Sequence, residues 1–458
     1  MSLQFIIGSS GSGKSCYAYQ NIIEQAGLHP EKLFFVIVPE QFTMQTQKTL
    51  VEMSPGRGIL NIDILSFERL AYRVLEEVGG DSRMLLEETG KSMVLQKMVQ
   101  QHGKELSYLG GQMRKAGYLD EVKSILSEFM QYDIRDSEIQ EMIEDSSDRA
   151  LLQMKLKDVS VLYQAFIGYL KDHYMTGEEV MDALEKALPF SKKMKNSVLL
   201  LDGYTGFTPI QMRVVGELLA VCEKVMVTVT MDATENLSTR GKPYQLFYMS
   251  RQMIHGLSEL TRDIEESILL KDVRKSRFSQ APALHFLEKN IFRYRKNVYK
   301  KKQDEICMFS ATSPLKEMEE TARRIARLVR EKDCRYGEIA VITGNLEEYG
   351  NLAKQVFTAA GIPYFIDEKH TVLMNPFVEY FRAALEMAVQ DFSYESVFRY
   401  LRCGMSCVTR EEADLLENYV LALGIRGFKK WDEVWVRIYR GMPPESIQRL
   451  NEIRERFA

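Results

Sequence analysis

The sequence predicts an α/β protein in which a parallel sheet is interrupted by an all-helical insertion and followed by a second α/β unit and a helical C-terminal part. Three observations lead to this class. An apolar segment, a glycine- and serine-rich turn and a helical pattern follow one another in residues 3–26. Strand and helix patterns alternate through the first 75 residues. Strand patterns then return at residues 198–202, after a long stretch that has helical patterns only.

Composition narrows the class of protein. A chain of 458 residues is too long for one core, so several domains are expected. Hydrophobic content of 45% and charged content of 27% are typical of globular proteins. With 60 basic and 64 acidic side chains, any nucleic-acid surface must be a local patch. Apolar stretches are too short for a membrane span, no signal peptide precedes Leu3, and the cysteines show no disulfide framework, so we expect a cytoplasmic protein without membrane contact.

Residues 8–15 match the phosphate-binding loop G-x-x-x-x-G-K-[ST]. The strand pattern before the loop and the helical pattern 15–26 after it give the context that the motif requires. Backbone N–H groups then point at a phosphate, while the lysine reaches the β- and γ-phosphates and the last serine holds Mg²⁺. The alternative is a chance match in a glycine–serine turn. The predicted ATP–Mg²⁺ site comprises Gly8, Ser9, Ser10, Gly11, Ser12, Gly13, Lys14 and Ser15.

Further patterns predict the rest of the first sheet. Residues 33–38 and 59–64 read as strands, and residues 66–78 as a helix with Ser66 as its N-cap. Helical patterns alone fill residues 80–190, with amphipathic stretches at 121–132 and 151–172. Strands are expected again at 198–202 and 224–230, with a helix at 209–221 between them. The first lobe is therefore discontinuous, residues 1–79 and 191–288, around a helical insertion, residues 80–190.

The second half repeats the α/β pattern without a phosphate loop. Strands are expected at 306–311, 338–343 and 363–366, and helices at 317–331 and 347–360. This gives a second lobe, residues 304–390, after a basic linker, residues 289–303. Residues 391–458 read as helices, and the charged helical pattern at 456–458 has no capping signal, so a truncated chain is expected. A plan of two RecA-like lobes favours a helicase-like motor over a small kinase.

Nucleotide hydrolysis needs an aspartate near Mg²⁺ and a second acid or glutamine that positions water. Asp202 ends an apolar strand, as the first role requires, and its alternative is a strand-end residue that caps a turn. Residues 202–211 resemble the Asp-Glu-Phe-Gln-Asp-Thr-x-x-x-Gln box of UvrD-type helicases, but Gly203 replaces the glutamate. In those motors the strand equivalent to 339–342 leads to an arginine, whereas here Thr343-Gly344-Asn345 follows. We therefore predict weak hydrolysis and no catalytic residue.

Several separate stretches resemble AddB, the second subunit of the AddAB (RexAB-like) helicase–nuclease of bacterial recombinational repair. They are residues 38–43, 66–75, 201–209, 361–369 and 416–425. The resemblance spans nearly the whole chain but only the N-terminal, helicase-like portion of that subunit. It implies a heterodimer with an AddA-type motor–nuclease subunit, DNA ends and single-stranded DNA as partners, and scanning for Chi during double-strand break repair by homologous recombination. It places the nuclease domain and its iron–sulfur cluster in a C-terminal part that this sequence lacks.

The resemblance also implies a DNA-binding surface on the first lobe. The matching residues are Gln41, Thr43, Phe67, Arg69 and Tyr72. Amides and hydroxyls read base edges, aromatic rings stack on bases, and arginine pairs with phosphate. The alternative is that Phe67 and Tyr72 belong to a helix core. Tryptophan is frequent at position 72 in the family, so tyrosine changes the expected stacking strength and sequence preference.

The basic run between the lobes could also hold a DNA backbone. Its cations are interleaved with Phe292, Tyr294 and Tyr299; they are Lys289, Arg293, Arg295, Lys296, Lys300, Lys301 and Lys302. A solvated linker is the alternative. For the whole chain two further functions stay open: an active UvrD-type helicase whose catalytic acid comes from elsewhere, and a P-loop kinase of a small molecule. We expect no nuclease activity from these residues.

Overall fold

The computed structural model describes residues 2–79, 83–113, 115–235, 239–272, 276–293, 296–368 and 372–457. The chain divides into two units, residues 1–308 and 309–458, and each is described by itself. Tyr294 and Arg295 of the basic run, and Lys369 at the end of the stretch 361–369, lie outside the described ranges.

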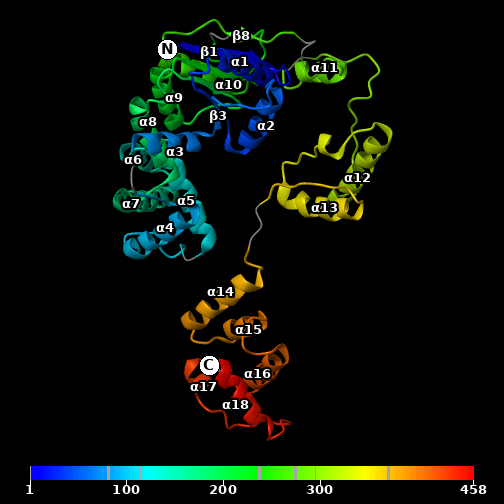
Figure 1. The fold of residues 1–458 in the computed structure, drawn as a ribbon. Coiled ribbons are helices and arrows are strands. Elements are labelled where there is room, and N and C mark those ends of the chain that lie inside the picture. The colour runs from blue at the N-terminus through cyan, green and yellow to red at the C-terminus, as the bar shows by residue number, and fades with distance from the viewer. Residues whose placement is uncertain are drawn as a thin grey trace. The chain divides into compact units, whose positions relative to one another are not determined.

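A parallel sheet of six strands forms the centre of the first unit's described part, with the strand order β3-β2-β6-β7-β1-β8 (Figure 1). Its strands are β1 (Ser2–Gly8), β2 (Phe34–Ile37), β3 (Ile62–Leu65), β6 (Val198–Leu201), β7 (Lys224–Thr230) and β8 (Ile268–Leu269). Parallel strands all deliver their carboxyl ends to one edge. Gly8 pairs with Thr230, and Leu201 pairs with Val227, so the ends of β1, β7 and β6 meet there.

The helices of the first unit's α/β part cover both faces of this sheet. They are α1 (Lys14–Leu28), α2 (Thr43–Met53), α3 (Phe67–Val78), α8 (Gly177–Ala187), α9 (Pro209–Val221) and α10 (Tyr248–Leu260). The unit also contains the helix α11 (Pro282–Asn290) and the 3-10 turns η1 (Glu40–Phe42) and η2 (Leu188–Phe190). Side chains alternate between the faces along each strand. Leu199 and Leu201 pack with α3, α8, α9 and α10, whereas Leu200 packs with α1 and α2. Burial on both faces explains the continuous apolar runs.

A helical part with its own hydrophobic core lies between α3 and α8 in the chain. Its helices are α4 (Glu88–His102), α5 (Ala116–Gln131), α6 (Asp136–Asp145) and α7 (Ala150–His173). Leu95, Leu126 and Leu162 contribute to this core, which is separate from those of the sheet. The part begins and ends at two short strands, β4 (Met84–Leu85) and β5 (Tyr174–Met175), which pair in parallel.

Local sequence signals fix several boundaries. Ser66 Oγ accepts the N–H of Arg69 and begins α3, as predicted. Thr208 and Gln211 form a reciprocal capping box at the start of α9. The glutamine that resembles the last position of the helicase box therefore uses its side chain as a helix cap, because Gln211 Oε1 accepts the N–H of Thr208 at 3.0 Å.

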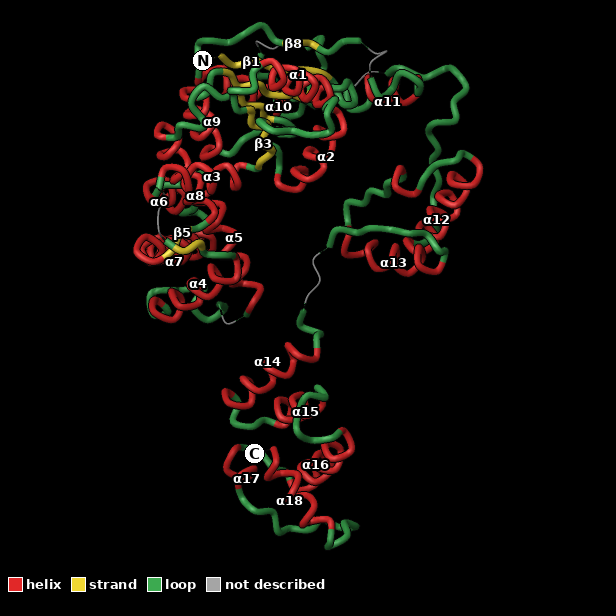
Figure 2. The backbone as a smooth tube through the Cα atoms, viewed as in Figure 1, coloured by secondary structure: helices red, strands yellow, loops and turns green. Residues whose placement is uncertain are grey.

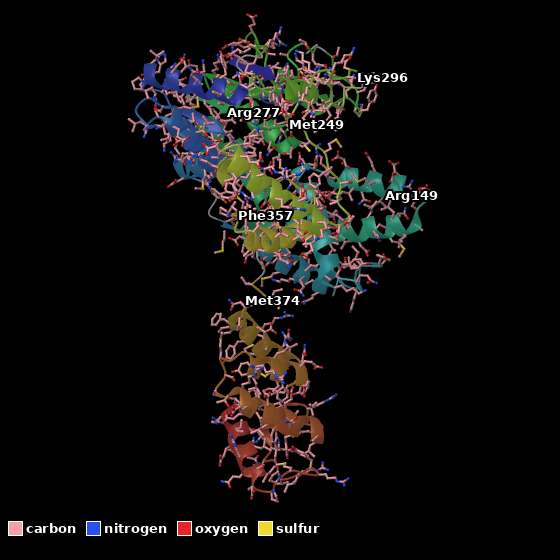
Figure 3. The ribbon with its side chains drawn as sticks, turned by 90° about the vertical axis from the view of Figure 1, so that its right-hand side faces the viewer. Arg149, Met249, Arg277, Lys296, Phe357 and Met374 are labelled. Carbon is pink, nitrogen blue, oxygen red and sulfur yellow. The ribbon has the colours of Figure 1, made fainter. Side chains whose placement is uncertain are left out.

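The second unit consists of helices and loops in the residues described (Figure 2). Its helices are α12 (Pro314–Glu331), α13 (Leu346–Ala359), α14 (Pro376–Val389), α15 (Tyr394–Arg402), α16 (Arg410–Leu423), α17 (Phe428–Asp432) and α18 (Ser446–Phe457), with the 3-10 turn η4 (Tyr336–Glu338). Phe357, labelled in Figure 3, lies in the core that α12 and α13 share. A second core from α14 to α18 is centred on Tyr419, Trp431 and Trp435.

The strands predicted at 306–311, 338–343 and 363–366 were wrong for this structure. The helices expected after the first two are present as α12 and α13, but none of the three segments is a strand. Each segment has an apolar side chain that is open to solvent: Met308 is 93%, Ile342 93% and Phe365 89% exposed. A strand requires a hydrogen-bonded neighbour, and apolar composition alone does not supply one.

The prediction of an α/β protein with a parallel central sheet is confirmed. The boundaries of the five sequence segments stay predictions. Within the residues that the structure describes, no helix has the length and apolar character needed to cross a lipid bilayer.

Candidate nucleotide-binding site

The predicted phosphate loop lies between β1 and α1, at the edge where the parallel strands end. Its backbone depends on glycine at three positions. Gly11 and Gly13 have φ of +74° and +88°, which L side chains rarely adopt. A Cβ on Gly8 would lie 2.3 Å from Ser12 Oγ, so a side chain at this position would force Ser12 to move.

Lys14 is folded back into this loop. Its Nζ donates to the backbone oxygen of Ser9 at 3.0 Å. Burial lowers the pKa of Lys14, while the negative charges of Asp202 and Glu288 act in the opposite direction. The loop therefore surrounds the ammonium group of Lys14, and two carboxylates lie nearby. This position is expected of a lysine that would replace its carbonyl partner with a phosphate oxygen when a nucleotide binds.

Asp202 follows β6 and reaches the start of α1. Its Oδ1 accepts from Ser15 Oγ at 3.0 Å and from Thr228 Oγ1 at 2.5 Å, and its Oδ2 accepts from Tyr19 OH at 2.6 Å. Asp202 is 5% exposed. Burial, together with the Asp202 charge, raises the pKa of Tyr19, which keeps this phenol a donor. The structure therefore brings the two predicted Mg²⁺-linked residues, Ser15 and Asp202, into direct contact.

The donor set has the chemistry that Mg²⁺ requires. Hydroxyl and carboxylate oxygens are the hard ligands that this ion prefers, and it usually retains several waters and binds through one or two carboxylates plus substrate phosphates. Ser15 and Asp202 supply the protein oxygens beside the loop. Among the residues described, no group of three or more histidine, cysteine, aspartate or glutamate side chains could hold a metal without a nucleotide.

The two positions where catalytic groups are lacking have structural roles. Gly203 has φ of +83°, and its N–H donates to Thr228 Oγ1 at 3.4 Å. The backbone after Asp202 is thus left-handed, a conformation that disfavours glutamate as well as any other side chain with a Cβ. Asn345, in the turn 343–345 that follows the segment compared with the arginine-bearing strand, caps α13 by accepting the N–H of Glu348.

Sequence reasoning missed one group of residues near the loop. Arg293, assigned to the basic run, is 8% exposed and pairs with Asp232 through two contacts of 2.9 Å and with Glu288 at 3.1 Å. Hydrogen bonding to Asp232 raises the pKa of Arg293. Asp232 comes two residues after the end of β7, a pattern similar to that of Asp202, which directly follows β6. This strand-end position is the sequence signal that could have identified Asp232.

The other lysines of the basic run, Lys289, Lys296, Lys300, Lys301 and Lys302, are exposed. Arg293 is not, so the basic run is divided between a buried ion pair and a solvent-facing set. The alternative of a solvated linker fits these lysines as well as a DNA contact does.

The five residues of the predicted DNA surface differ in exposure. Phe67 is 5% exposed, and its ring centroid lies 5.5 Å from that of Tyr204 and 6.1 Å from that of Phe207. Thr43 is also buried, and its hydroxyl donates to the backbone of Glu40 at 2.9 Å. These two residues belong to the packed interior.

The remaining three members, Gln41, Arg69 and Tyr72, are exposed to solvent. Arg69 pairs with Glu40 at 2.8 Å, which joins η1 to α3. Tyr72 is 40% exposed and lies on the same helix as Arg69.

Comparison with known proteins decides the family. The family model "ADDB, N-terminal" matches residues 5–288, which is more than half of the chain and includes the phosphate loop, Asp202 and α11 except for its last two residues. The chain belongs to the AddB family. Three relatives are each named as the B subunit of an ATP-dependent helicase/deoxyribonuclease. Identity is 42% for that of Lachnoclostridium phytofermentans, 34% for that of Caldanaerobacter subterraneus and 37% for that of Clostridium tetani.

The matches to these AddB relatives extend over 99%, 100% and 94% of this chain, but over only 40%, 40% and 38% of the relatives. The chain therefore spans about two fifths of the length of the relatives it matches. The resemblance seen in the separate sequence stretches is confirmed as family membership.

Proposed function

We propose that this AddB-family chain binds ATP–Mg²⁺ through residues 8–15 and Asp202 and serves as a helicase-like subunit with little hydrolytic activity of its own. The observation that carries the proposal is the contact of Ser15 with Asp202 behind a glycine-dependent phosphate loop. Its place at the carboxyl edge of a parallel sheet is where α/β proteins bind ligands. We take the first unit to be RecA-like because of the strand order of its sheet and its phosphate loop.

We infer weak hydrolysis from the residue that follows Asp202 and from the turn 343–345. The next position is a left-handed glycine, so no acid is attached to the backbone there. The turn 343–345 contains no arginine, and its last residue, Asn345, is a helix cap. Loss of an arginine finger alone reduces turnover by about 10³–10⁵ in nucleotide hydrolases that use one. The site then serves to bind nucleotide, and the chemistry belongs to another subunit.

The names of the relatives describe a helicase and deoxyribonuclease subunit, and we propose the same assembly here. An AddA-type partner would supply the motor, and the chain would bind single-stranded DNA and scan it for Chi during break repair in the cytoplasm. Gln41, Arg69 and Tyr72 are the exposed members of the proposed DNA surface. To bind phosphate, Arg69 must exchange its partner Glu40. A nuclease domain with an iron–sulfur cluster is proposed for the whole protein only.

Nucleotide binding is tested by titrating the chain with a fluorescent ATP analogue in excess MgCl₂. Lys14→Ala removes the ammonium group inside the loop and is expected to weaken binding at least tenfold. The control is Lys48→Ala, because Lys48 is an exposed lysine on α2. Equal affinity of parent and Lys14→Ala would exclude the loop as the site.

Hydrolysis is tested separately by phosphate release with and without single-stranded DNA. We expect turnover far below one per second in both conditions, compared with the roughly 1–10³ s⁻¹ that is usual for enzymes. DNA-stimulated turnover of several per second that Lys14→Ala abolishes would support the active-helicase alternative. Phosphoryl transfer to a small acceptor without DNA binding would support a kinase.

A further inference from the structure

The helix α11 and the turn before it lie against the phosphate loop, although they are more than 250 residues away in the sequence. Arg277, labelled in Figure 3, donates its N–H to the backbone oxygen of Gly11 at 2.9 Å. A Cβ on Gly11 would lie 2.9 Å from the ring of Phe278. The ring of Phe278 in turn lies 6.3 Å, centroid to centroid, from that of His285 on α11. This part of the chain forms a wall of the loop.

A second set of contacts places Glu288 at the same edge. Met231 donates its N–H to the backbone oxygen of Gly8 at 3.1 Å, so the chain leaving β7 touches the first residue of the loop. The next residue, Asp232, pairs with Arg293, whose Nη2 also contacts Glu288 Oε1 at 3.1 Å. Arg293 therefore links Glu288 to Asp232, which follows the strand that borders the phosphate loop.

One of the two carboxylate oxygens of Glu288 does not take part in these contacts. Glu288 Oε2 is fully buried and has no hydrogen-bond partner among the residues described. Ser12 Oγ, on the phosphate loop itself, is in the same situation. Buried polar atoms without partners are costly and rare, and each calls for a group that satisfies it. Glu288 is also one of the two carboxylates whose charge acts on Lys14, the other being Asp202.

We propose that Glu288 is a second acidic residue of the nucleotide site, and that it makes binding of a nucleoside triphosphate depend on a divalent cation. The proposal rests on the proposed nucleotide-binding function. A triphosphate without a metal ion brings several negative charges toward the carboxylates of Asp202 and Glu288 and is repelled. A hydrated divalent cation offsets the negative charge of the triphosphate. Its water molecules can donate hydrogen bonds to a buried carboxylate oxygen.

A purely structural role for Glu288 is the competing explanation, since it also holds Arg293. Asp232 separates the two roles. It holds Arg293 with two contacts of its own, but it is not among the charges that act on Lys14. Asp232→Asn therefore weakens the Arg293 anchor and leaves the charge of Glu288 in place. Glu288→Gln removes the charge and keeps an oxygen that can accept from Arg293.

The experiment measures the affinity of a fluorescent ATP analogue in excess MgCl₂ and in excess EDTA, for the parent, Glu288→Gln, Asp232→Asn and the exposed Glu24→Gln. In the parent, affinity is expected to be much lower in EDTA. In Glu288→Gln the affinity in EDTA rises at least about tenfold, because one charge roughly 3 Å from a phosphate has this effect even at the dielectric constant of water. Asp232→Asn and Glu24→Gln keep the parent's ratio of the two affinities.

An unchanged ratio in Glu288→Gln, or an equal change in Asp232→Asn, would overturn the proposal and leave Glu288 as an anchor of Arg293. Thermal unfolding of each variant, followed by circular dichroism, shows that the compared proteins are folded. A parent that binds no nucleotide in either buffer overturns the proposed function itself, and Glu288 with it. The two failures are therefore distinguishable.

Discussion

Ser15 and Asp202 are separated by 187 residues in the sequence, and their side chains are joined by a hydrogen bond of 3.0 Å. The contact depends on the register of three strands, because β7 lies between the strand that leads to the loop and the strand that ends at Asp202. Gly8 is aligned with Thr230, and Leu201 with Val227. A slip of one residue would turn these side chains to the other face and separate the pair.

The left-handed backbone of Gly203 predicts a loss of stability on substitution. Gly203→Ala is expected to lower the free energy of unfolding by about 1–2 kcal/mol, since a Cβ is strained at this φ even though the space around it is adequate. Gly27→Ala, in α1 with open space around it, is expected to raise stability by up to about 1 kcal/mol. Urea unfolding of both variants tests the opposite signs. A neutral Gly203→Ala would contradict the conformational argument.

The burial of Phe67 predicts that two parts of the proposed DNA surface respond differently to truncation. Phe67→Ala should destabilise the first unit by about 3–5 kcal/mol, because it leaves a cavity beside Tyr204 and Phe207. Urea unfolding followed by circular dichroism measures this loss. A change below about 1 kcal/mol would contradict the core position of Phe67.

Truncation of the exposed members should act on DNA binding instead. Tyr72→Ala is expected to weaken binding of single-stranded DNA by about 1–3 kcal/mol, the usual contribution of a stacked base, with stability unchanged. Arg69→Ala should also lower the slope of log affinity against log salt by about 0.7. Anisotropy of a labelled oligonucleotide over a range of KCl concentrations measures both. If neither variant differs from the parent, DNA binds elsewhere.

Glu77 predicts a pH-dependent contribution to stability. Its carboxylate accepts from Ser191 Oγ at 2.7 Å and from the N–H groups of Lys192 and Lys193 at 2.8 and 3.0 Å. Desolvation raises the pKa of Glu77, but these hydrogen bonds outweigh it and hold the pKa below the ordinary value. A carboxyl with a depressed folded-state pKa stabilises the fold above its unfolded-state pKa, and this contribution is lost as pH falls through the folded-state value.

Glu77→Gln should therefore be less stable than the parent by about 1 kcal/mol at neutral pH. The difference should shrink below about pH 4, where the unfolded-state carboxyl takes up its proton. Unfolding midpoints in urea across this range measure it. The control is Glu76→Gln, a change of the exposed neighbour on the same helix. A difference that persists unchanged to pH 2 would show that the effect is not electrostatic.

The ion pair of Lys91 with Glu178 predicts an asymmetry between single and double substitution. Lys91 Nζ lies 3.0 Å from both carboxylate oxygens, and the two side chains are 5% and 10% exposed. Lys91→Met leaves a buried carboxylate without its partner and should cost about 3–5 kcal/mol. Adding Glu178→Leu should recover most of that loss. A double variant as unstable as Lys91→Met would rule out the buried charge as the cause.

Much of the first unit could be predicted from local signals. The bounds of β7 and α9 agree with the sequence patterns, and Ser66 caps α3 as expected, because apolar periodicity and capping act within a few residues. The two-residue strand β8 carries no such pattern, and its pairing with β1 comes from the tertiary fold. In the second unit the apolar segments 338–343 and 363–366 have the composition of strands without the neighbours that make them so.

The candidate site shows the same division. The phosphate loop and Asp202 were predictable, since a motif and a strand-end acid identify them in the sequence. Arg293 and Glu288 were not assigned to the site, because only the return of the chain across the sheet edge brings α11 to the loop. A run of basic residues cannot reveal from the sequence alone which member is neutralised by a carboxylate such as Asp232.

The parallel pair of β4 and β5 has a consequence for how the chain tolerates change. The polypeptide leaves through Met84–Leu85 and returns through Tyr174–Met175, and these two strands are hydrogen-bonded neighbours. A crossover linker of about a dozen residues between these parallel strands could replace α4 to α7 without altering the order of the six-stranded sheet. Because the exit and the return are adjacent, the helical part can lengthen, shorten or be exchanged at a single junction. Lys91 and Glu178 form an ion pair across this junction, so the two residues must be replaced together.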